Sequence, residues 1–331
     1  MRSEVVAAAL ERTFGSLPEE AAAGLPVYRG KVRDVVVGKD RLLLVASDRL
    51  SAFDRVLSTV PFKGEVLARI AAFWFRETAD LVPNHVIGPE ETGGLDVTEA
   101  TGRCALVRKA DMLPVEVVVR GYLSGSAWRD YREGRPVSGL VLPSGLERDE
   151  KFPVPILTPS TKEAAGHDRP VSGAELVASG IVERELWVEV ERAALSLFRR
   201  GQELAARRGL ILVDTKYEFG LVDGRLVVAD EIHTPDSSRY WYADGYAERF
   251  TARDAQRELD KEAFRRWLMD RGWSGDGEPP SIPDELRVET ALRYVRAFEA
   301  ITGEKFVPVD LDPQALAKSA ADIARGHVAE N

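Results

Sequence analysis

Acidic and basic side chains lie beside apolar runs between residues 210 and 241, which read LILVDTKYEFGLVDGRLVVADEIHTPDSSRYW. Two apolar runs, 210–213 and 226–229, flank the pair Asp223-Gly224, and this pattern predicts a β-hairpin. Carboxylates next to buried strands are costly unless a partner neutralises them, and a hard divalent cation with phosphate is a natural partner. An exposed hairpin with solvated charges is the alternative.

The register of this hairpin decides which charged side chains face together. A strict two-residue turn at Asp223-Gly224 leaves Asp230 on the opposite face from Glu218. A three-residue loop with a bulge at Gly224 instead places Lys216, Glu218 and Asp230 on one face. The residues alone leave both arrangements open.

A glycine between basic residues precedes a second predicted hairpin, whose strands cover 32–37 and 42–46. Gly30 lets the backbone approach a phosphate, and Lys31 and Arg33 supply the neutralising charge. The segment GKVRD is not a Walker A loop. A solvated strand edge is therefore the alternative for Lys31 and Arg33.

A Gly/Ser loop and a short predicted helix follow a strand that ends in an arginine, in the segment RGYLSGSAWRDY at 120–131. Arg120 offers a planar fork for a carboxylate or phosphate. The loop before the helix could bind an anion through hydroxyl and amide groups. In the alternative, Ser126 is an ordinary helix cap beside a surface arginine.

A polar stretch rich in proline covers residues 153–170 and reads PVPILTPSTKEAAGHDRP. It predicts a loop, and one too long to be an idle connection. Its chemically active side chains are those of Lys162, His167 and Asp168. We interpret His167 as a residue that structures the loop or contacts substrate rather than as a general base.

Composition limits the class of protein. The 331 residues suffice for one large domain or two ordinary ones, and 44% hydrophobic with 30% charged residues is typical of a soluble globular chain. A net charge of −9 argues against a general nucleic-acid binder. Cys104 is the single cysteine, which excludes an intrachain disulfide. No run approaches a membrane span and no secretory signal is evident, so we expect a cytoplasmic protein.

Two lobes are expected, at residues 1–113 and 114–331. The linker 109–114 joins two predicted strands, and such a linker is a common place for an adenine ring, which makes Lys109 and Met112 candidate nucleotide contacts. Periodic apolar residues and capping signals predict helices in the first twenty residues and at 65–78, 182–208, 261–271, 284–302 and 313–325.

An ordered set of motifs resembles one enzyme family. The motifs are GKVRD at 30–34, SDRLSAFD at 47–54, VRGYLSGSAW at 119–128, TPSTK at 158–162, DTKYEFG at 214–220 and DEIHTPDSSRYW at 230–241. Together they resemble phosphoribosylaminoimidazole-succinocarboxamide synthase (SAICAR synthetase). The resemblance covers residues 25–268, and its last two motifs are the most specific.

The resemblance implies an α+β fold with two ATP-clasping lobes, similar in outline to kinase and ATP-grasp architectures, plus C-terminal helices. It implies an ATP-dependent ligase of de novo purine biosynthesis. ATP, 5-aminoimidazole-4-carboxylate ribonucleotide and L-aspartate would give ADP, phosphate and SAICAR through an acyl phosphate. The implied cofactors are ATP and Mg²⁺, and the implied partners are these small molecules, with no nucleic acid and no membrane.

Roles for individual residues follow from the resemblance. Glu218 and Asp230 match magnesium-associated acids, which favours the bulged register, and Lys216 matches a lysine beside the phosphates. The turn with Gly30, Lys31 and Arg33 matches an ATP-covering hairpin. The residues that match the ribonucleotide side are Arg120, Ser126, Asp236, Ser238, Arg239 and Arg265, and those that border the amino-acid substrate are Lys162, His167 and Asp168.

Two other functions remain as alternatives. A small-molecule kinase with the same ATP site would need a hydroxyl acceptor and a catalytic aspartate of the HRD type, and no such motif is present in the sequence. A non-catalytic nucleotide-binding protein would be expected to have lost its acids, yet Lys216, Glu218 and Asp230 are all present. A homo-oligomer is left open.

Overall fold

The chain forms two compact units in the computed structural model, which describes residues 1–53, 55–162, 168–259 and 262–329. Unit 1 comprises residues 1–73, 85–109 and 260–331, and unit 2 comprises 74–84 and 110–259. The sequence placed residues 114–331 in one lobe. The last 72 or so residues instead group with unit 1, and the chain passes into unit 2 after Lys109, close to the expected boundary.

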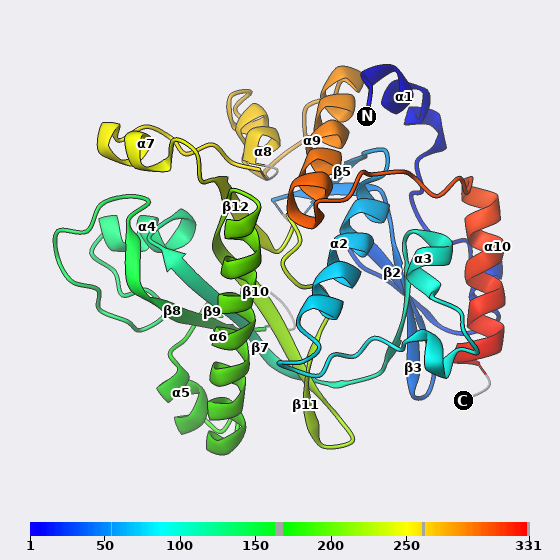
Figure 1. The fold of residues 1–331 in the computed structure, drawn as a ribbon, viewed down its shortest axis with the longest axis horizontal. Coiled ribbons are helices and arrows are strands. Elements are labelled where there is room, and N and C mark those ends of the chain that lie inside the picture. The colour runs from blue at the N-terminus through cyan, green and yellow to red at the C-terminus, as the bar shows by residue number, and fades with distance from the viewer. Residues whose placement is uncertain (54, 163–167, 260–261, 330–331) are drawn as a thin grey trace. The chain divides into compact units, whose positions relative to one another are not determined.

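Unit 1 is built on a four-stranded antiparallel sheet of order β1-β2-β3-β6, of which Figure 1 labels β2 and β3. Its strands are β1 (Val27–Arg29), β2 (Arg33–Val37), β3 (Arg41–Ala46) and β6 (Cys104–Arg108). Alternate side chains, such as Val36, Leu43 and Val45, point into one core cluster. Leu316 of helix α10 (Pro313–Ile323) closes the same cluster, so the C-terminal helix covers this sheet.

The helices of unit 1 largely follow their capping signals. Helix α9 spans Asp284–Thr302 as expected and ends at Gly303 in the left-handed conformation. The Asp312 side chain accepts hydrogen bonds from the first backbone amides of α10. Helices α2 (Lys63–Glu77) and α8 (Glu262–Met269) confirm two further predictions, and a small sheet pairs β4 (Arg49–Ala52) with β5 (Arg55–Thr59).

The expected helix over the first twenty residues is wrong. Helix α1 covers only Ser3–Ala8, and two 3₁₀ turns follow at Leu10–Arg12 and Glu19–Ala22. Gly15 and Pro18 interrupt the pattern, since glycine weakens a helix and proline cannot donate a backbone hydrogen bond.

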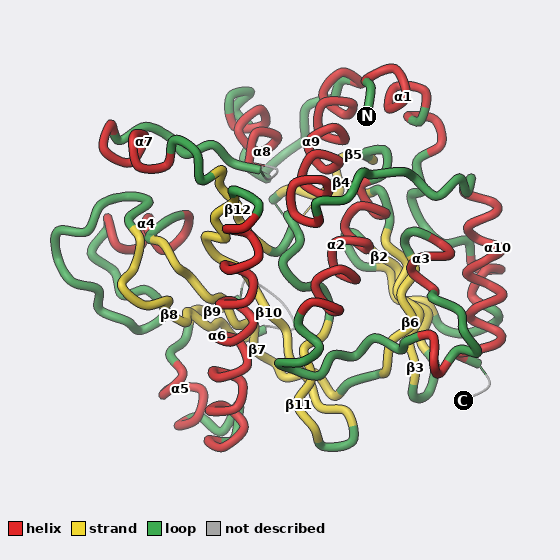
Figure 2. Tube along the Cα trace, in the orientation of Figure 1, coloured by secondary structure: helices red, strands yellow, loops and turns green. Residues whose placement is uncertain are grey.

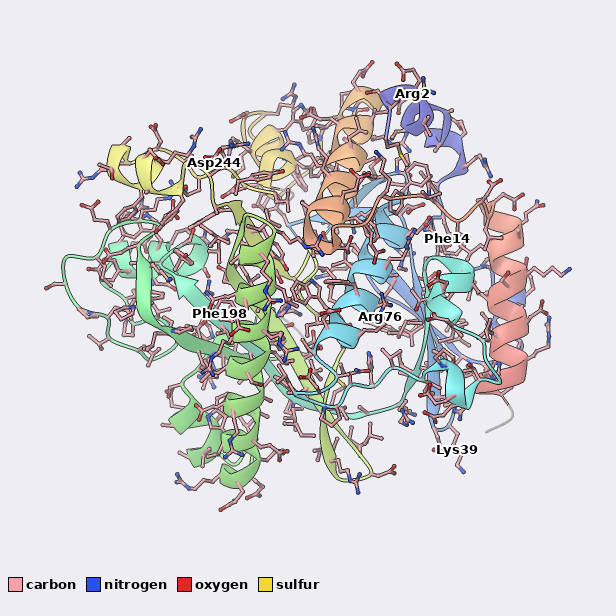
Figure 3. The ribbon with its side chains drawn as sticks, viewed as in Figure 1. Arg2, Phe14, Lys39, Arg76, Phe198 and Asp244 are labelled. Atoms are coloured by element: carbon pink, nitrogen blue, oxygen red, sulfur yellow. The ribbon has the colours of Figure 1, made fainter. Side chains whose placement is uncertain are left out.

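Unit 2 contains a six-stranded antiparallel sheet. Five strands follow the order β11-β10-β7-β8-β9, and β12 also pairs with β10 (Figure 2). Its strands are β7 (Asp111–Tyr122), β8 (Lys151–Thr161), β9 (Arg169–Pro170), β10 (Leu210–Val222), β11 (Arg225–Ala229) and β12 (Ser238–Tyr242). Helix α6 (Arg184–Arg207) packs along β10, and its fully buried Phe198 is labelled in Figure 3. The other α-helices of unit 2 are α4 (Gly125–Arg132), α5 (Gly173–Ala178) and α7 (Tyr246–Ala252), whereas α3 (Val97–Thr101) belongs to unit 1.

Residues 151–161 form a strand where a loop was expected. Strand β8 pairs with β7 despite three prolines, and its register shifts between Tyr122↔Lys151 and Arg120↔Ile156. Pro153 and Pro155 lie within that irregular stretch, where the ladder needs no donor from them. Polar residues and prolines are typical of loops, so the composition of this stretch predicted a loop and not a strand.

The bulged register expected for the β10–β11 hairpin is also wrong. Val222 pairs with Arg225, and Asp223 and Gly224 both take positive φ, at 51° and 74°. That is the two-residue turn whose twist matches its flanking strands. Asp230 lies just beyond β11 with φ of 66°, so strand alternation does not set the direction of its side chain.

Among the described residues, no helix is both long and apolar enough to cross a membrane.

Candidate functional site

An arginine site forms in unit 2 where strands β7, β8, β10 and β12 lie side by side. We define it by Arg120, Ser126, Thr158, Asp214 and Arg239. Nη1 atoms of both arginines lie 3.3 Å from Oδ2 of Asp214. Arg120 also donates from Nε to the Thr158 hydroxyl at 2.9 Å and from Nη2 to the Ser126 hydroxyl at 3.0 Å.

The strand registers bring these residues together. Asp214 on β10 lies opposite Arg120 on β7 and opposite Arg239 on β12. Gly125, with φ of 59°, begins helix α4, and a Cβ there would meet Arg239 Nη2 at 2.5 Å. The Gly/Ser loop is therefore shaped to accept a guanidinium group. Ser126 accepts a hydrogen bond from Arg120 and is not the N-cap residue of α4, so the alternative of an ordinary helix cap beside a surface arginine does not describe this loop.

The arginine site carries more positive than negative charge, with two guanidinium groups around one carboxylate. Burial lowers the pKa of Arg120, the nearby Arg239 lowers it further, and Asp214 opposes both. The group still stays protonated at neutral pH, as arginine does in proteins. A guanidinium has more N–H donors than the three bonds Arg120 makes. It can therefore bind oxygens of a phosphate or carboxylate.

A second group of charges lies on the same sheet, and we call it the lysine–glutamate cluster. Lys216 Nζ lies 2.7 Å from Oε1 of Glu116 and 2.7 Å from Oε1 of Glu218. Lys162 Nζ reaches the other oxygen of Glu218 at 2.6 Å. Lys216 and Glu218 alternate on β10, Glu116 faces them from β7, and Lys162 directly follows β8.

Lys216 and Glu218 are held in their charged forms. Burial would raise the pKa of Glu218, but Lys216 and Lys162 outweigh it and hold the pKa well below its usual range. Burial likewise opposes the charge on Lys216, yet Glu218 and Glu116 raise the pKa of that ammonium above its ordinary value. The result is an ionised carboxylate and a cationic lysine, which suit a metal–phosphate ligand.

The loop from Asp230 to Ser237 runs beside both groups and is fixed by a buried histidine. His233 has no exposed surface, its Nε2 is hydrogen-bonded to the Tyr217 hydroxyl, and its carbonyl accepts from the Tyr240 hydroxyl at 2.8 Å. Burial lowers the pKa of His233 to about 3, so its ring is neutral. The loop returns to β10 where the Lys216 amide donates to the Ser237 carbonyl at 2.9 Å.

The other predicted residues of this loop are placed as follows. The Ser238 hydroxyl is 2.7 Å from that of Thr215, on the strand pair that also aligns Asp214 with Arg239. The Asp236 amide donates to the Thr234 hydroxyl. Asp230 and Asp236 are half-buried.

In unit 1, residues 30–33 form a tight turn between β1 and β2, which we call the glycine turn. The Gly30 amide donates to the Arg33 carbonyl at 2.9 Å, and a Cβ on Gly30 would crowd that carbonyl at 3.1 Å. Lys31 is exposed and Arg33 is half-buried. Lys109, also in unit 1, is exposed and bonded through its amide to the Asp40 carbonyl.

The remaining predicted residues are not brought into either group. Met112 is 44% exposed on β7, and a Cβ on Gly220 would meet its sulfur at 3.1 Å. Asp168 is exposed just before β9. His167 lies outside the described residues, and Arg265 is on α8 in unit 1, where only its backbone is described.

Three residues of the two groups were not predicted as site residues from the sequence. Glu116 interrupts the apolar alternation of VEVVVR, and a lone acid on a buried strand was a detectable signal. Asp214 was noticed within DTKYEFG but had no partner to suggest its role. Thr158 belonged to the stretch interpreted as a loop, so its register opposite Val118, two residues before Arg120 on β7, could not be foreseen.

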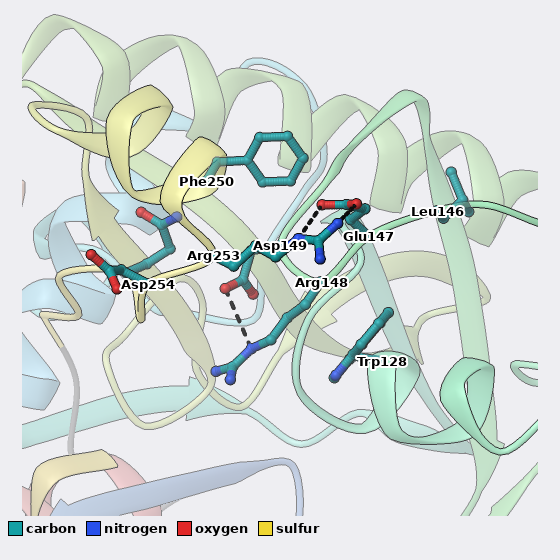
Figure 4. Close-up of a pocket in the computed structure, with 9 residues that line it drawn as sticks. Trp128, Leu146, Glu147, Arg148, Asp149, Phe250, Arg253 and Asp254 are labelled. Carbon is teal, nitrogen blue, oxygen red and sulfur yellow. Dashed lines mark hydrogen bonds and ion pairs between the residues drawn. The ribbon is translucent and has the colours of Figure 1, made fainter.

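A separate cavity of about 410 Å³ lies in unit 2 beside α4, and none of the predicted site residues lines it (Figure 4). Its charged side chains pair with each other, since Arg253 bonds to Glu147 and Arg148 lies 3.5 Å from Asp149. The Gln256 amide atoms at its wall are fully covered and make no hydrogen bond within the described part of the chain. Because those atoms are covered, a ligand in this cavity would not reach them.

No group of three or more histidine, cysteine or acidic side chains among the described residues could hold a metal alone. Mg²⁺ that arrives with a nucleotide needs only one or two protein carboxylates, because phosphate oxygens and water complete its shell. The ionised Glu218, with Asp230 at the end of the neighbouring strand, fits that kind of donor set.

An α+β chain with a half-buried arginine site and a balanced lysine–glutamate cluster is suited to an enzyme that handles anionic substrates. Residues 26–280 match the family model described as SAICAR synthetase. The chain belongs to the SAICAR synthetase family, whose activity is ATP-dependent ligation in purine biosynthesis. The kinase and non-catalytic alternatives are not favoured.

Relatives and solved structures agree with this assignment. Phosphoribosylaminoimidazole-succinocarboxamide synthase of Legionella pneumophila (strain Lens) is 47% identical over 85% of this chain and 88% of its own length. The Cytophaga hutchinsonii enzyme of the same name is 44% identical over 92% and 96%. The SAICAR synthase structure from Saccharomyces cerevisiae complexed with SAICAR has a TM-score of 0.74 and 32% identity, and the match covers 90% of this chain and 100% of that one.

A second solved structure bears on the nucleotide. It is a SAICAR synthetase in complex with ADP, with a TM-score of 0.64 and 28% identity over 86% of this chain and 100% of that one. Use of ATP is thereby supported for this family.

Proposed function

We propose that the arginine site holds the 5-aminoimidazole-4-carboxylate ribonucleotide and that the lysine–glutamate cluster binds the Mg²⁺-bound phosphates of ATP. The observation that carries this proposal is the pair Arg120 and Arg239 around the single carboxylate of Asp214. Two half-buried guanidinium groups around one carboxylate leave an excess of positive charge that suits a doubly anionic ligand, and the ribonucleotide carries both a phosphate and a carboxylate.

The reaction needs activation because oxide is too poor a leaving group for an amine to displace from a carboxylate. A carboxylate oxygen of the ribonucleotide attacks the γ-phosphorus of ATP, and ADP leaves. The aspartate amine then attacks the carbonyl carbon of the acyl phosphate, phosphate leaves, and one amine proton is lost. Two anions must be brought together, so charge neutralisation and alignment dominate catalysis.

Each residue has a defined part in this scheme. Arg120 and Ser126, with Arg239, Ser238 and Asp236, orient the ribonucleotide. Lys216 places its ammonium against phosphate oxygens as negative charge shifts toward ADP. The remaining contacts that we propose are Gly30, Lys31, Arg33, Lys109 and Met112 for ATP, Arg265 for the ribonucleotide, and Lys162, His167 and Asp168 for L-aspartate.

Glu218 and Asp230 are the residues that we propose for Mg²⁺. When bound, Mg²⁺ would neutralise and orient the phosphate oxygens. Both oxygens of Glu218 are bonded to lysines in the structure, at 2.7 and 2.6 Å. Binding of the metal would therefore free Lys216 or Lys162 to meet the phosphate that arrives with it.

A coupled assay that follows ADP and product together tests the function. With all three substrates, ADP and SAICAR should form in equal amounts, and omission of L-aspartate should abolish steady phosphate release. ADP formation with a hydroxyl-bearing acceptor and no need for aspartate would instead support the kinase alternative. A cytoplasmic location and a homo-oligomeric state stay predictions.

A further inference from the structure

Arg49 is nearly buried and makes an unusual number of bonds around the glycine turn. Its side chain is 12% exposed. Its Nη2 donates to the Gly30 carbonyl at 2.8 Å and to Oδ1 of Asp34 at 2.7 Å, and its Nε donates to the Lys31 carbonyl at 3.2 Å. Its Nη1 donates to the Gly15 carbonyl at 2.5 Å. One guanidinium thus holds two successive carbonyls of the turn.

A serine two residues earlier holds the next carbonyl. The Ser47 hydroxyl and the Ser47 amide both donate to the Val32 carbonyl, at 2.8 and 2.9 Å. The carbonyls of residues 30, 31 and 32 are therefore all drawn toward the segment Ser47–Arg49. Both donors belong to the SDRLSAFD motif at 47–54, one of the motifs that carry the family resemblance.

The geometry of the peptide bond fixes the direction of the amides on the other side of the turn. In a trans peptide the carbonyl of one residue and the N–H of the next point in opposite directions. Carbonyls drawn toward Arg49 and Ser47 therefore direct the amides of Lys31, Val32 and Arg33 the other way. Successive amides directed to one side make the concavity in which proteins hold phosphate oxygens.

Asp34 fixes the guanidinium itself. Its side chain is fully buried, and its second oxygen accepts the Leu17 amide at 2.7 Å. A buried carboxylate bound on both oxygens holds Arg49 in one orientation. A lysine could keep the charge, but its single ammonium could not reach two carbonyls and a carboxylate with the same planar fork.

We propose that Arg49 is a positioning residue that sets the backbone of the glycine turn for the phosphates of ATP, with Ser47 as its auxiliary. This proposal rests on the proposed contact between the turn and ATP. Arg49 acts through the carbonyls of residues 30 and 31 and does not touch the nucleotide itself.

The test compares two arginine-to-lysine variants of unit 1. Arg49→Lys should raise the KM for ATP about tenfold, the effect of losing one hydrogen bond to a charged group. The KM values for the ribonucleotide and aspartate should stay within about twofold of wild type. Arg103→Lys is the matched control, because Arg103 is 11% exposed and bonds to buried Asp48 at 3.0 Å. It should lower the Tm without changing the KM for ATP.

A merely structural Arg49 would lower the Tm as Arg103→Lys does and leave the KM for ATP unchanged, and that result would overturn the proposal. Lys31→Met distinguishes failure of the positioning role of Arg49 from failure of the contact between the turn and ATP. If Lys31→Met weakens ATP and Arg49→Lys does not, only the positioning role fails; if neither does, the contact between the turn and ATP fails. Should Arg49→Lys not fold, Ser47→Ala decides, with a KM for ATP raised about threefold or the proposal rejected.

Discussion

The two charged groups of unit 2 occupy one sheet yet differ in their charge balance. In the arginine site, Arg120 and Arg239 share one oxygen of Asp214. In the lysine–glutamate cluster, two ammonium groups meet two carboxylates at 2.6 to 2.7 Å. The first group has a net charge of +1 and the second has none.

This difference predicts how each group meets its ligand. A site with an excess of cationic donors can take up an anion with little rearrangement. A balanced cluster must exchange its internal ion pairs, and a metal ion with phosphate carries both charges that such an exchange needs. The arginine site should therefore govern affinity for the ribonucleotide, and the cluster should govern turnover with ATP.

The largest effect should come from removing a carboxylate of the proposed metal pair. Glu218→Gln, or Asp230→Asn, should lower kcat on the order of a hundredfold, because an electrostatic contact to the transferring phosphate is lost. Steady-state ADP formation over a range of Mg²⁺ concentrations measures this, with circular dichroism as a check on the fold. Glu147→Gln is the control, since it removes a carboxylate from an ion pair elsewhere in unit 2. Normal turnover in both acid variants would refute the metal assignment.

The arginine site should respond in affinity rather than in turnover. Arg239→Ala removes one guanidinium from Asp214, and a truncated buried pair costs about 2 kcal/mol or more, which is roughly thirtyfold in KM for the ribonucleotide. The KM for ATP should change much less. Arg257→Ala is the control, because Arg257 forms an exposed pair with Asp244 at 3.7 Å and does not belong to the arginine site. An equal rise in both KM values would contradict the division of labour between the two groups.

The acid dependence of stability separates the two groups further. The lysines lower the pKa of Glu218 from its usual 4.5 to about 2, so its pairing stabilises the folded state fully above pH 4.5 and loses that effect as pH falls toward 2. The difference in unfolding free energy between wild type and Glu218→Gln should therefore shrink over that interval. Urea titrations at a series of pH values measure it, and a constant difference would exclude an ionic role for the cluster.

Two buried histidines also make the unfolding free energy depend on pH, equally in wild type and in Glu218→Gln. Their contribution therefore cancels in the difference between the two proteins. Burial lowers the pKa of His85 and of His233 to about 3. Each ring is neutral when folded but becomes protonated in the unfolded chain below pH 6.5, so stability falls from pH 6.5 downward. This slope begins two pH units above the interval in which Glu218 titrates.

Much of the fold followed from local signals because those signals act over a few residues. Asp312 with Pro313 marks the start of α10, and Gly303 marks the end of α9. Tertiary pairing overrode the local signal elsewhere. The prolines of β8 are accommodated by a register shift that exists only because β7 lies beside it.

The residues of the candidate site were likewise predicted only where the signal was local. Motif residues such as Lys216, Glu218 and Arg120 were found because they are charged within apolar runs. Their partners were not, because Glu116 and Asp214 meet them across strands about 100 residues apart in the chain. The bulged register failed because it was chosen to place Asp230 beside Glu218, whereas Asp223-Gly224 alone already specified the turn.

The smallest and sharpest test uses two serines of one loop. Ser126 accepts from Arg120 at 3.0 Å, whereas the buried Ser124 hydroxyl donates to Asp149 at 2.7 Å. Ser126→Ala should raise the KM for the ribonucleotide about threefold to tenfold, the effect of losing one typical net hydrogen bond, with little change in Tm. Ser124→Ala should do the reverse and lower unfolding free energy by about 1–3 kcal/mol. If both variants change only the Tm, the arginine site is scaffolding, and affinity for the ribonucleotide must come from elsewhere in the chain.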